Sequence, residues 1–333
     1  MGFEAQDIER KVISILRILD DSEKPLGSRI IAQRLKDYGI DLGERAVRYH
    51  LKLMDERGLT QLVGQRDGRL LTERGIEEVS SALVKDKVGL TISRIELLAF
   101  RTDFDLEKLT GSVPINISMF PKKEFTKALQ VMKPVIDSGF CISDLVAVAQ
   151  EGDLLGEMLI PRNKVGLATV CSIVINGTLL KMGIPIDSKF SGILQIRNSK
   201  PLRFVELINY SGCSLDASEV FIRARMTSVL ETIREGNGRI LATYREIPAP
   251  CRPLVTEVVD KMKRAGLGGV LRVGANSEEV YEIPVEPNRI GMVVINGLNP
   301  VAAVTETGIE VENHGMSSIV EYQKLVKFDE LLS

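Results

Sequence analysis

The stretch ERAVRYHLKLMDERGL, residues 44–59, decides how the N-terminal part of this chain folds. Val47, Leu51 and Met54 recur at the spacing of one helix face, and Gly58 supplies the stop. The opposite, solvent side of the predicted helix then carries Glu44, Arg45, Arg48, Tyr49 and Lys52. Three cationic side chains on one face predict that this helix binds a polyanion.

The segments on both sides of this helix complete the pattern of a winged helix-turn-helix domain over residues 1–85. Apolar residues at helical spacing predict two earlier helices, over about residues 8–19 and 28–38. After the basic helix, the stretch LTQLVGQRDGRLLT, residues 59–72, alternates around Asp67 and Gly68, which is typical of a hairpin. Three helices followed by a hairpin predict that the third helix enters the major groove of DNA and that the hairpin contacts its backbone.

This arrangement assigns different roles to the basic residues. Arg45 and Arg48 are candidates for contacts with guanine edges or phosphates, because a guanidinium can bind either with two hydrogen bonds. Lys52, Arg66 and Arg69 are candidates for phosphate contacts that position the protein without specifying sequence. The alternative is that these charges are only the solvated face of a small helical bundle. The hairpin with its two arginines favours the DNA-binding interpretation.

The basic character is local, since the whole chain of 333 residues has 45 acidic and 43 basic residues. Between Lys24 and Arg74 the sequence has eleven Lys and Arg against seven Asp and Glu, a surplus of four. A local surplus of positive charge on an otherwise neutral protein is typical of a single binding face.

Composition also limits the class of protein. No apolar run reaches the roughly 18–20 residues that a membrane span needs, and the charged N-terminus lacks a signal peptide's apolar stretch. We therefore expect a cytoplasmic protein with no membrane partner. The four cysteines are far apart and the histidines number only two, so neither a disulfide framework nor a metal cluster is expected.

Residues 86–112, with the stretch TISRIELLAF, predict a linker helix, and a different pattern begins at Val113. From there to residue 333, strand-like and helical runs alternate, which indicates an α/β (α+β) body. Pro134 is expected to bend or break the helix that follows the first strand. The stretch EVYEIPV, residues 279–285, is expected to be a strand.

The body has the pattern of an internal duplication, with copies at about 113–200 and 237–325. An offset of 125 residues needs no gaps over a long stretch and pairs Asn163 with Asn288 and Lys164 with Arg289. The similar words IVING, residues 173–177, and VVING, residues 293–297, lie 120 apart and are interpreted as partly coincidental. Two such copies predict a cleft between the halves, where small-ligand sites commonly form.

No enzyme motif stands out in this body. It has no Gly-x-Gly-x-x-Gly, no Walker loop, no Gly-x-Ser-x-Gly and no His-x-x-x-His. His314 is the body's one histidine, whereas His50 falls on the inner side of the basic helix and is interpreted as packed. Cys171 precedes a predicted helix and is either a thiol activated by the helix N-terminus or a small packing residue. An alternative to a regulator is a metabolic enzyme acting on a small carboxylate with an accessory helix-turn-helix domain.

Four stretches resemble the NrpR family of archaeal nitrogen-regulation transcriptional repressors. They are LGERAVRYHLKLMDERGL (42–59), ATVCSIVINGTLLKMGIPIDSKFSG (168–192), YSGCSLDASEVFI (210–222) and LATYREIPA (241–249). The resemblance implies a dimer, or higher even oligomer, that binds palindromic operators of nitrogen-assimilation and nitrogen-fixation genes. It also implies that 2-oxoglutarate, an effector and not a cofactor, releases the operator. Some relatives carry two effector domains and this chain carries one, which leaves open a second NrpR-type chain or the transcription machinery as a partner.

A dicarboxylate effector needs fixed cations or converging N–H donors, because an unpaired buried charge is costly. The two N-[KR]-[VI]-G turns place Lys164 and Arg289 at equivalent points of the copies. Small residues at predicted helix starts offer donors, since helix N-termini attract carboxylates. These residues are Thr169, Cys171, Ser172, Ser211, Gly212, Cys213 and Ser214. The alternative for each of these residues is a solvated or merely turn-forming role.

Overall fold

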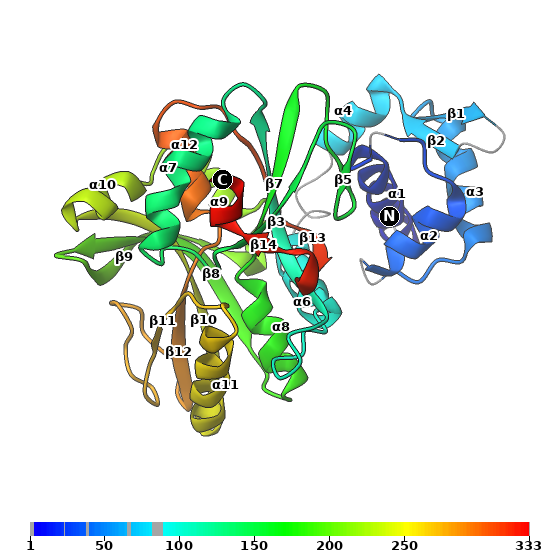
Figure 1. The fold of residues 1–333 in the computed structure, drawn as a ribbon. Coiled ribbons are helices and arrows are strands. Elements are labelled where there is room, and N and C mark those ends of the chain that lie inside the picture. The colour runs from blue at the N-terminus through cyan, green and yellow to red at the C-terminus, as the bar shows by residue number, and fades with distance from the viewer. Residues whose placement is uncertain (1–2, 23, 38–39, 65–67, 82–88, 333) are drawn as a thin grey trace. The chain divides into compact units, whose positions relative to one another are not determined.

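The structure is a computed structural model that describes residues 3–22, 24–37, 40–64, 68–81 and 89–332. The chain divides into two compact units, Met1–Val88 and Gly89–Ser333 (Figure 1). No helix in the described part of the chain is long and apolar enough to cross a membrane.

The first unit has the predicted order of a winged helix-turn-helix. Its elements are α1 (Phe3–Asp20), α2 (Ser28–Asp37), α3 (Glu44–Glu56), β1 (Thr60–Gly64), β2 (Gly68–Leu71) and α4 (Glu73–Ser81). Val47, Leu51 and Met54 of α3 are fully buried and pack in one core with α1 and α2. This packing fixes which face of α3 remains in solvent.

The wing is a small antiparallel sheet formed by β1 and β2. Leu26 forms an isolated β-bridge with this sheet, because its backbone exchanges two hydrogen bonds of 3.0 Å with Arg69. Gly68 has a φ of +100°, and a Cβ there would lie 2.3 Å from the carbonyl carbon of Leu26. Glycine at this position therefore allows the backbone of Leu26 to approach the wing. Arg66 and Asp67, predicted for the hairpin tip, lie outside the described residues.

The second unit repeats one β-α-β-β-α-β order twice. The first copy is β3 (Ser112–Pro121), α7 (Phe125–Asp137), β4 (Leu145–Ala149), β7 (Lys164–Val170), α8 (Ile173–Lys181) and β8 (Asp187–Arg197). The second copy is β10 (Gly238–Pro248), α11 (Arg252–Arg264), β11 (Val270–Val273), β12 (Arg289–Ile295), α12 (Asn299–Glu306) and β13 (Glu312–Glu321). Asn163 and Asn288 precede equivalent strands, and both have left-handed backbones with φ of 62° and 59°. The offset of 125 residues is confirmed, because IVING lies in α8 whereas VVING ends β12.

The two copies exchange their last strands. One five-stranded sheet has the order β13-β3-β7-β4-β14 and the other has the order β11-β12-β10-β8-β9. Each copy's final strand therefore pairs with the other copy's first strand, and these pairings are antiparallel. The helices follow the same rule, since α7 packs beside α12 and α11 beside α8 (Figure 1). The body is thus an intertwined, pseudo-twofold α+β fold with residues of both copies at its centre.

The remaining elements connect or cover these sheets. They are α6 (Leu90–Arg101), the β5–β6 hairpin (Leu154–Leu155, Met158–Leu159), β9 (Lys200–Asn209), the 3-10 turn Tyr210–Gly212, α9 (Ala217–Arg223), α10 (Val229–Glu235) and β14 (Val326–Lys327). The helix that the sequence suggested as a linker is α6, and it packs against α8 and β13 as part of the second unit.

Two local predictions need correction. Pro134 does not break α7, which continues to Asp137, because burial of Val135 and Ile136 offsets the hydrogen bond that proline cannot donate. Residues 279–285 form no strand apart from a bridge between Val280 and Ile283. The two residues between them have positive φ angles, which turn the chain back on itself.

Candidate functional site

The exposed face of α3 is the candidate nucleic-acid interface. Glu44, Arg45, Arg48, Tyr49 and Lys52 are all exposed, as the sequence predicted, and Tyr49 is 63% exposed. Arg48 lies 3.7 Å from Glu44 one turn away, a surface ion pair that costs little to open. His50 is buried on the opposite side, in agreement with a packed role. The face therefore presents three cations and one aromatic ring.

Arg69 has a different environment from the α3 cations. Its Nε lies 2.8 Å from Oδ2 of Asp55, near the end of α3, and its side chain is only 19% exposed. Asp55 also accepts a hydrogen bond from Thr60 Oγ1 at 2.5 Å. Asp55 therefore ties both strands of the wing to α3. Arg69 therefore holds the wing against α3, and its contact with phosphate stays a prediction.

The two cations proposed for the effector are each paired with a carboxylate. Lys164 Nζ lies 2.5 Å from Glu312 Oε2. Arg289 Nε lies 3.6 Å from Glu286 and 4.0 Å from the buried Glu246. Both cations begin their strands, β7 and β12. Each cation therefore lies at the opposite end of its strand from the residues that follow that strand. The separation is about seven residues, or roughly 23 Å of extended chain.

A small closed cavity lies between the two copies, where β7 and β12 end. Its lining residues from the copies are Asn116, Cys171, Ser172, Ile173, Ser188, Thr243, Arg245, Asn296, Leu298 and Met316. Its volume is about 20 Å³, enough for about one water molecule. A Cβ on Gly297 would lie 2.3 Å from the carbonyl oxygen of Val170, so a glycine lets the two copies meet here.

Arg245 is the dominant charge of this cavity. It is 3% exposed, and its Nη2 donates to Ser172 Oγ at 2.9 Å and to the Ser172 carbonyl at 3.2 Å. Nε and Nη1 have no hydrogen-bond partner, and no carboxylate in the described ranges pairs with this guanidinium. Burial lowers the pKa of Arg245 to about 10, so the side chain stays charged at neutral pH. A buried cation without a counter-ion is costly, which makes this cavity a candidate site for an anion.

Two carboxyl groups lie beside the same cavity. Asp216 begins α9 and accepts hydrogen bonds from the backbone of Ser218 and Glu219 at 2.7 and 3.2 Å. Glu219 accepts a hydrogen bond of 2.7 Å from the backbone of Gly315. Burial raises the pKa of Asp216, and burial together with Asp216 raises the pKa of Glu219 to about 7. Both groups therefore become neutral more readily than ordinary carboxyls, which weakens their repulsion of an anion.

The structure brings part of the predicted effector set to this cavity. Cys171 and Ser172 line it, and Thr169 Oγ1 accepts a hydrogen bond of 3.4 Å from the lining residue Asn116. Burial raises the pKa of Cys171 to about 11, which supports a packing role over an activated thiol. Ser211, Gly212, Cys213 and Ser214 are exposed or half-buried, between the lining residues Tyr210 and Asp216. These four residues therefore do not line the cavity.

Arg245, Asn116 and Asn296 line the cavity and were not predicted from the sequence. Arg245 had an available signal, because GRILATYREIP is an apolar strand interrupted by two adjacent charged residues. A charge at a buried strand position needs a partner or a function. Asn116 and Asn296 had no such signal, since asparagine is common in turns and strand ends.

A winged helix with an exposed cationic helix, joined to a duplicated body around a polar cavity, defines a transcriptional regulator. Known proteins resemble the chain in both parts. Residues 88–327 match the NrpR regulatory domains NRD1 and 2, and residues 13–79 match the Ribonuclease R winged-helix domain. The chain belongs to the NrpR family of nitrogen regulators.

Individual relatives agree with this assignment. The chain is 43% identical to the global nitrogen regulator NrpRI of Methanosarcina mazei, over 96% of this chain and 98% of that protein. It is 30% identical to the global nitrogen regulator NrpR of Methanococcus maripaludis, but spans only 55% of that protein's length. Among solved structures, a nitrogen repressor-like protein from Methanococcus jannaschii has a TM-score of 0.61 and 26% identity, over 72% of this chain and 98% of that one. The chain is therefore a nitrogen-regulating transcriptional repressor by family, and not an enzyme.

Proposed function

We propose that this chain binds palindromic operator DNA of nitrogen-assimilation and nitrogen-fixation genes through α3, in the cytoplasm and as a dimer. We further propose that 2-oxoglutarate binds at Arg245 and releases the operator. The observation that carries the effector proposal is the buried guanidinium of Arg245, which has two unpaired nitrogens.

The DNA-binding proposal is supported by the environment of α3. Buried Val47, Leu51 and Met54 hold the helix so that Arg45, Arg48 and Lys52 all face solvent. A third helix with this presentation is the element that winged-helix proteins place in the major groove. Because few bases can be reached by one such helix, two chains on a symmetric operator give the affinity that repression needs.

The effector proposal is supported by the chemistry of the cavity walls. Arg245 Nε and Nη1 point in different directions, so each can donate a charge-assisted hydrogen bond to a separate oxygen of the effector. Asn116, Asn296 and Ser172 offer amide and hydroxyl groups around the same space. Lys164 and Arg289 are paired with carboxylates elsewhere, so we place Arg245 ahead of them as the effector's cation.

The cavity must open for a dicarboxylate, because about 20 Å³ admits little more than one water molecule. The wall best suited to move is the segment from Tyr210 to Asp216, whose ends line the cavity and whose middle residues lie at the surface. In the proposed mechanism, effector binding displaces this segment and favours a conformation with low operator affinity. A coupling of about 1–3 kcal/mol between the two sites would suffice.

The dimer proposal is supported by the outer edge of the second sheet. β9 ends the strand order, and Leu202, Val205 and Leu207 on it are exposed. An unpaired edge with apolar side chains is a surface that proteins usually cover. Replacing Val205 and Leu207 together by lysine should convert dimers to monomers in light scattering. An unchanged mass would place the dimer surface elsewhere.

The repressor proposal is tested by fluorescence anisotropy with DNA from the promoter regions of nitrogen-assimilation genes. We expect preferential binding to a palindromic segment, and a loss of about 1–3 kcal/mol for Arg48→Ala. Arg162→Ala is the matched control, because it removes an exposed arginine from the body. Addition of 2-oxoglutarate should lower operator affinity of the unmodified chain. Equal binding to unrelated DNA at moderate salt would contradict the proposal.

A further inference from the structure

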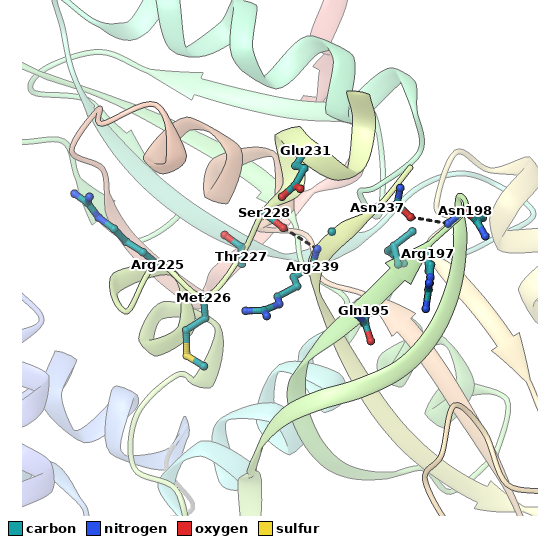
Figure 2. A pocket seen from close by; sticks show the side chains of 12 residues that line it. Gln195, Arg197, Asn198, Arg225, Met226, Thr227, Ser228, Glu231, Asn237 and Arg239 are labelled. Atoms are coloured by element: carbon teal, nitrogen blue, oxygen red, sulfur yellow. Dashed lines mark hydrogen bonds between the residues drawn. The ribbon is translucent and has the colours of Figure 1, made fainter. Parts of the chain in front are cut away.

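A second cavity opens at the far end of the β8–β10 strand pair and shares no lining residue with the Arg245 cavity (Figure 2). Its volume is about 640 Å³, within the range of small-molecule sites. The end of β8, the loop before α10 and the start of β10 form its walls. Six residues of β10, roughly 20 Å, separate Arg239 in this cleft from Arg245.

Three arginines line this cleft, and each is exposed. They are Arg197, Arg225 and Arg239. No carboxylate among the described residues lies within ion-pair distance of any of them. Glu231 is the one acidic residue in the lining, so three cations face one carboxylate, a surplus of two. This surplus stands out in a chain whose formal net charge is −2.

The backbone brings two of these cations, Arg197 and Arg239, to neighbouring positions. Arg239 pairs across the sheet with Gln195, and Arg197 lies two residues further along on the same face. Arg197 and Arg239 are therefore diagonal neighbours, at a Cα separation of about 7–8 Å. An anion bound between these two positions could therefore contact both side chains.

Hydrogen bonds join the walls of the cleft, and one residue of the loop before α10 is strained. Ser228 Oγ accepts from the Arg239 backbone at 3.0 Å, and Asn237 Oδ1 accepts from the Asn198 backbone at 3.0 Å (Figure 2). Arg225 has a φ of +54°, a left-handed conformation that is costly for any residue other than glycine. Strain of this kind persists where the surrounding structure fixes it and is concentrated at binding sites. The cleft is thus formed before any ligand arrives.

We propose that this cleft is a second anion site, for a small molecule that carries two or more phosphate groups. Guanidinium groups bind phosphate with paired hydrogen bonds, and three of them on two walls suit an extended polyanion. Among the described residues that line the cleft there is no aromatic ring, and Ile196 and Met226, the latter labelled in Figure 2, are its large apolar side chains. The phosphates, and not a stacked base, therefore carry recognition. The site is independent of the 2-oxoglutarate proposal.

The test is titration of the full-length chain with pyrophosphate in a calorimeter at constant ionic strength. We expect saturable binding of one pyrophosphate per chain. The double variant Arg197→Gln/Arg239→Gln should weaken it by roughly tenfold to a hundredfold per arginine, since each removes charge-assisted hydrogen bonds. Arg162→Gln makes the same change of charge at an exposed turn and should leave binding unchanged. Unfolding curves establish that both variants fold.

Three results would overturn the proposal. They are absence of saturable binding, an equal loss in the Arg162→Gln control, and displacement of pyrophosphate by 2-oxoglutarate. The last result would make the cleft the effector site. Conversely, Arg245→Met should bind pyrophosphate normally, whether or not it still binds 2-oxoglutarate. Failure of the effector proposal is therefore distinguishable from failure of this one.

Discussion

The two copies of the body differ most where their central strands meet. Ser118 on β3 and Arg245 on β10 are equivalent, because they face the equivalent residues Asn313 and Ser188 on the exchanged strands. A break in strand register follows this pair directly in the second copy and one pair further along in the first. Ser118 is buried and donates a hydrogen bond of 2.8 Å to Asn313. Arg245 is buried with two nitrogens unpaired.

This difference separates a structural position from a functional one within the same fold. The hydroxyl of Ser118 is hydrogen-bonded within the protein, so this position needs no ligand. The arginine leaves a buried charge that the protein does not neutralise, and such groups persist where a ligand completes them. Duplication gave two equivalent places, and only the second copy carries the cation.

The largest effect should come from making the first copy resemble the second, with Ser118→Arg. Burying another cation where Ser118 fits would add both an unpaired charge and excess volume, at a cost of about 4 kcal/mol or more. Urea unfolding measures this loss, and Ser118→Ala, with one lost hydrogen bond, should cost only about 1–2 kcal/mol. If Ser118→Arg does not lower the free energy of unfolding, the positions of Ser118 and Arg245 do not differ in their capacity to hold a buried cation.

The next effect concerns Gly297 and its equivalent in the first copy, Ser172. Gly297→Ala should destabilise the fold by about 2–3 kcal/mol, because the new Cβ would meet the backbone oxygen of Val170 at 2.3 Å. Ser172→Ala removes a hydrogen-bond acceptor of Arg245 and should cost about 1–2 kcal/mol. Equal effects in thermal unfolding would contradict this asymmetry of the cavity.

A further effect, which depends on pH, concerns the carboxyls beside Arg245. Because Glu219 has its pKa raised from 4.5 to about 7, the folded state loses stability as pH rises through this interval. This pKa shift corresponds to a change of roughly 3 kcal/mol in the free energy of unfolding. Because Glu219 keeps some exposure to solvent, we expect a change of about 2 kcal/mol. Glu219→Gln should therefore be more stable than the natural chain at pH 8, with the gain absent near pH 4.5. A gain of equal size at both pH values would point to packing instead.

Much of the fold could be predicted from the sequence because its signals are local. The spacing of Val47, Leu51 and Met54 indicated α3 and its exposed face, and the offset of 125 residues indicated the duplication. The exchange of β8 and β13 between sheets could not be predicted. Strand partners are set by packing between segments more than a hundred residues apart, and no periodicity within a strand encodes them.

The candidate site was predicted only in part, for a similar reason. Cys171 and Ser172 were identified from their place at a helix start, which is a local signal. Lys164 and Arg289 were chosen because they are cations at equivalent turns, but each has a carboxylate from elsewhere in the chain beside it. Sequence shows where the charges are, and only the fold shows which of them remain unpaired.

The most direct measurement combines 2-oxoglutarate calorimetry with urea unfolding for Arg245→Met. We expect binding to weaken by at least about a hundredfold, since two charge-assisted hydrogen bonds are lost. The free energy of unfolding without effector should stay equal or rise by about 1–3 kcal/mol, because an uncompensated buried charge has been removed. Operator binding should persist but no longer respond to 2-oxoglutarate. Normal effector binding by this variant, or a marked loss of stability without effector, would contradict the assignment of Arg245 as the effector's cation.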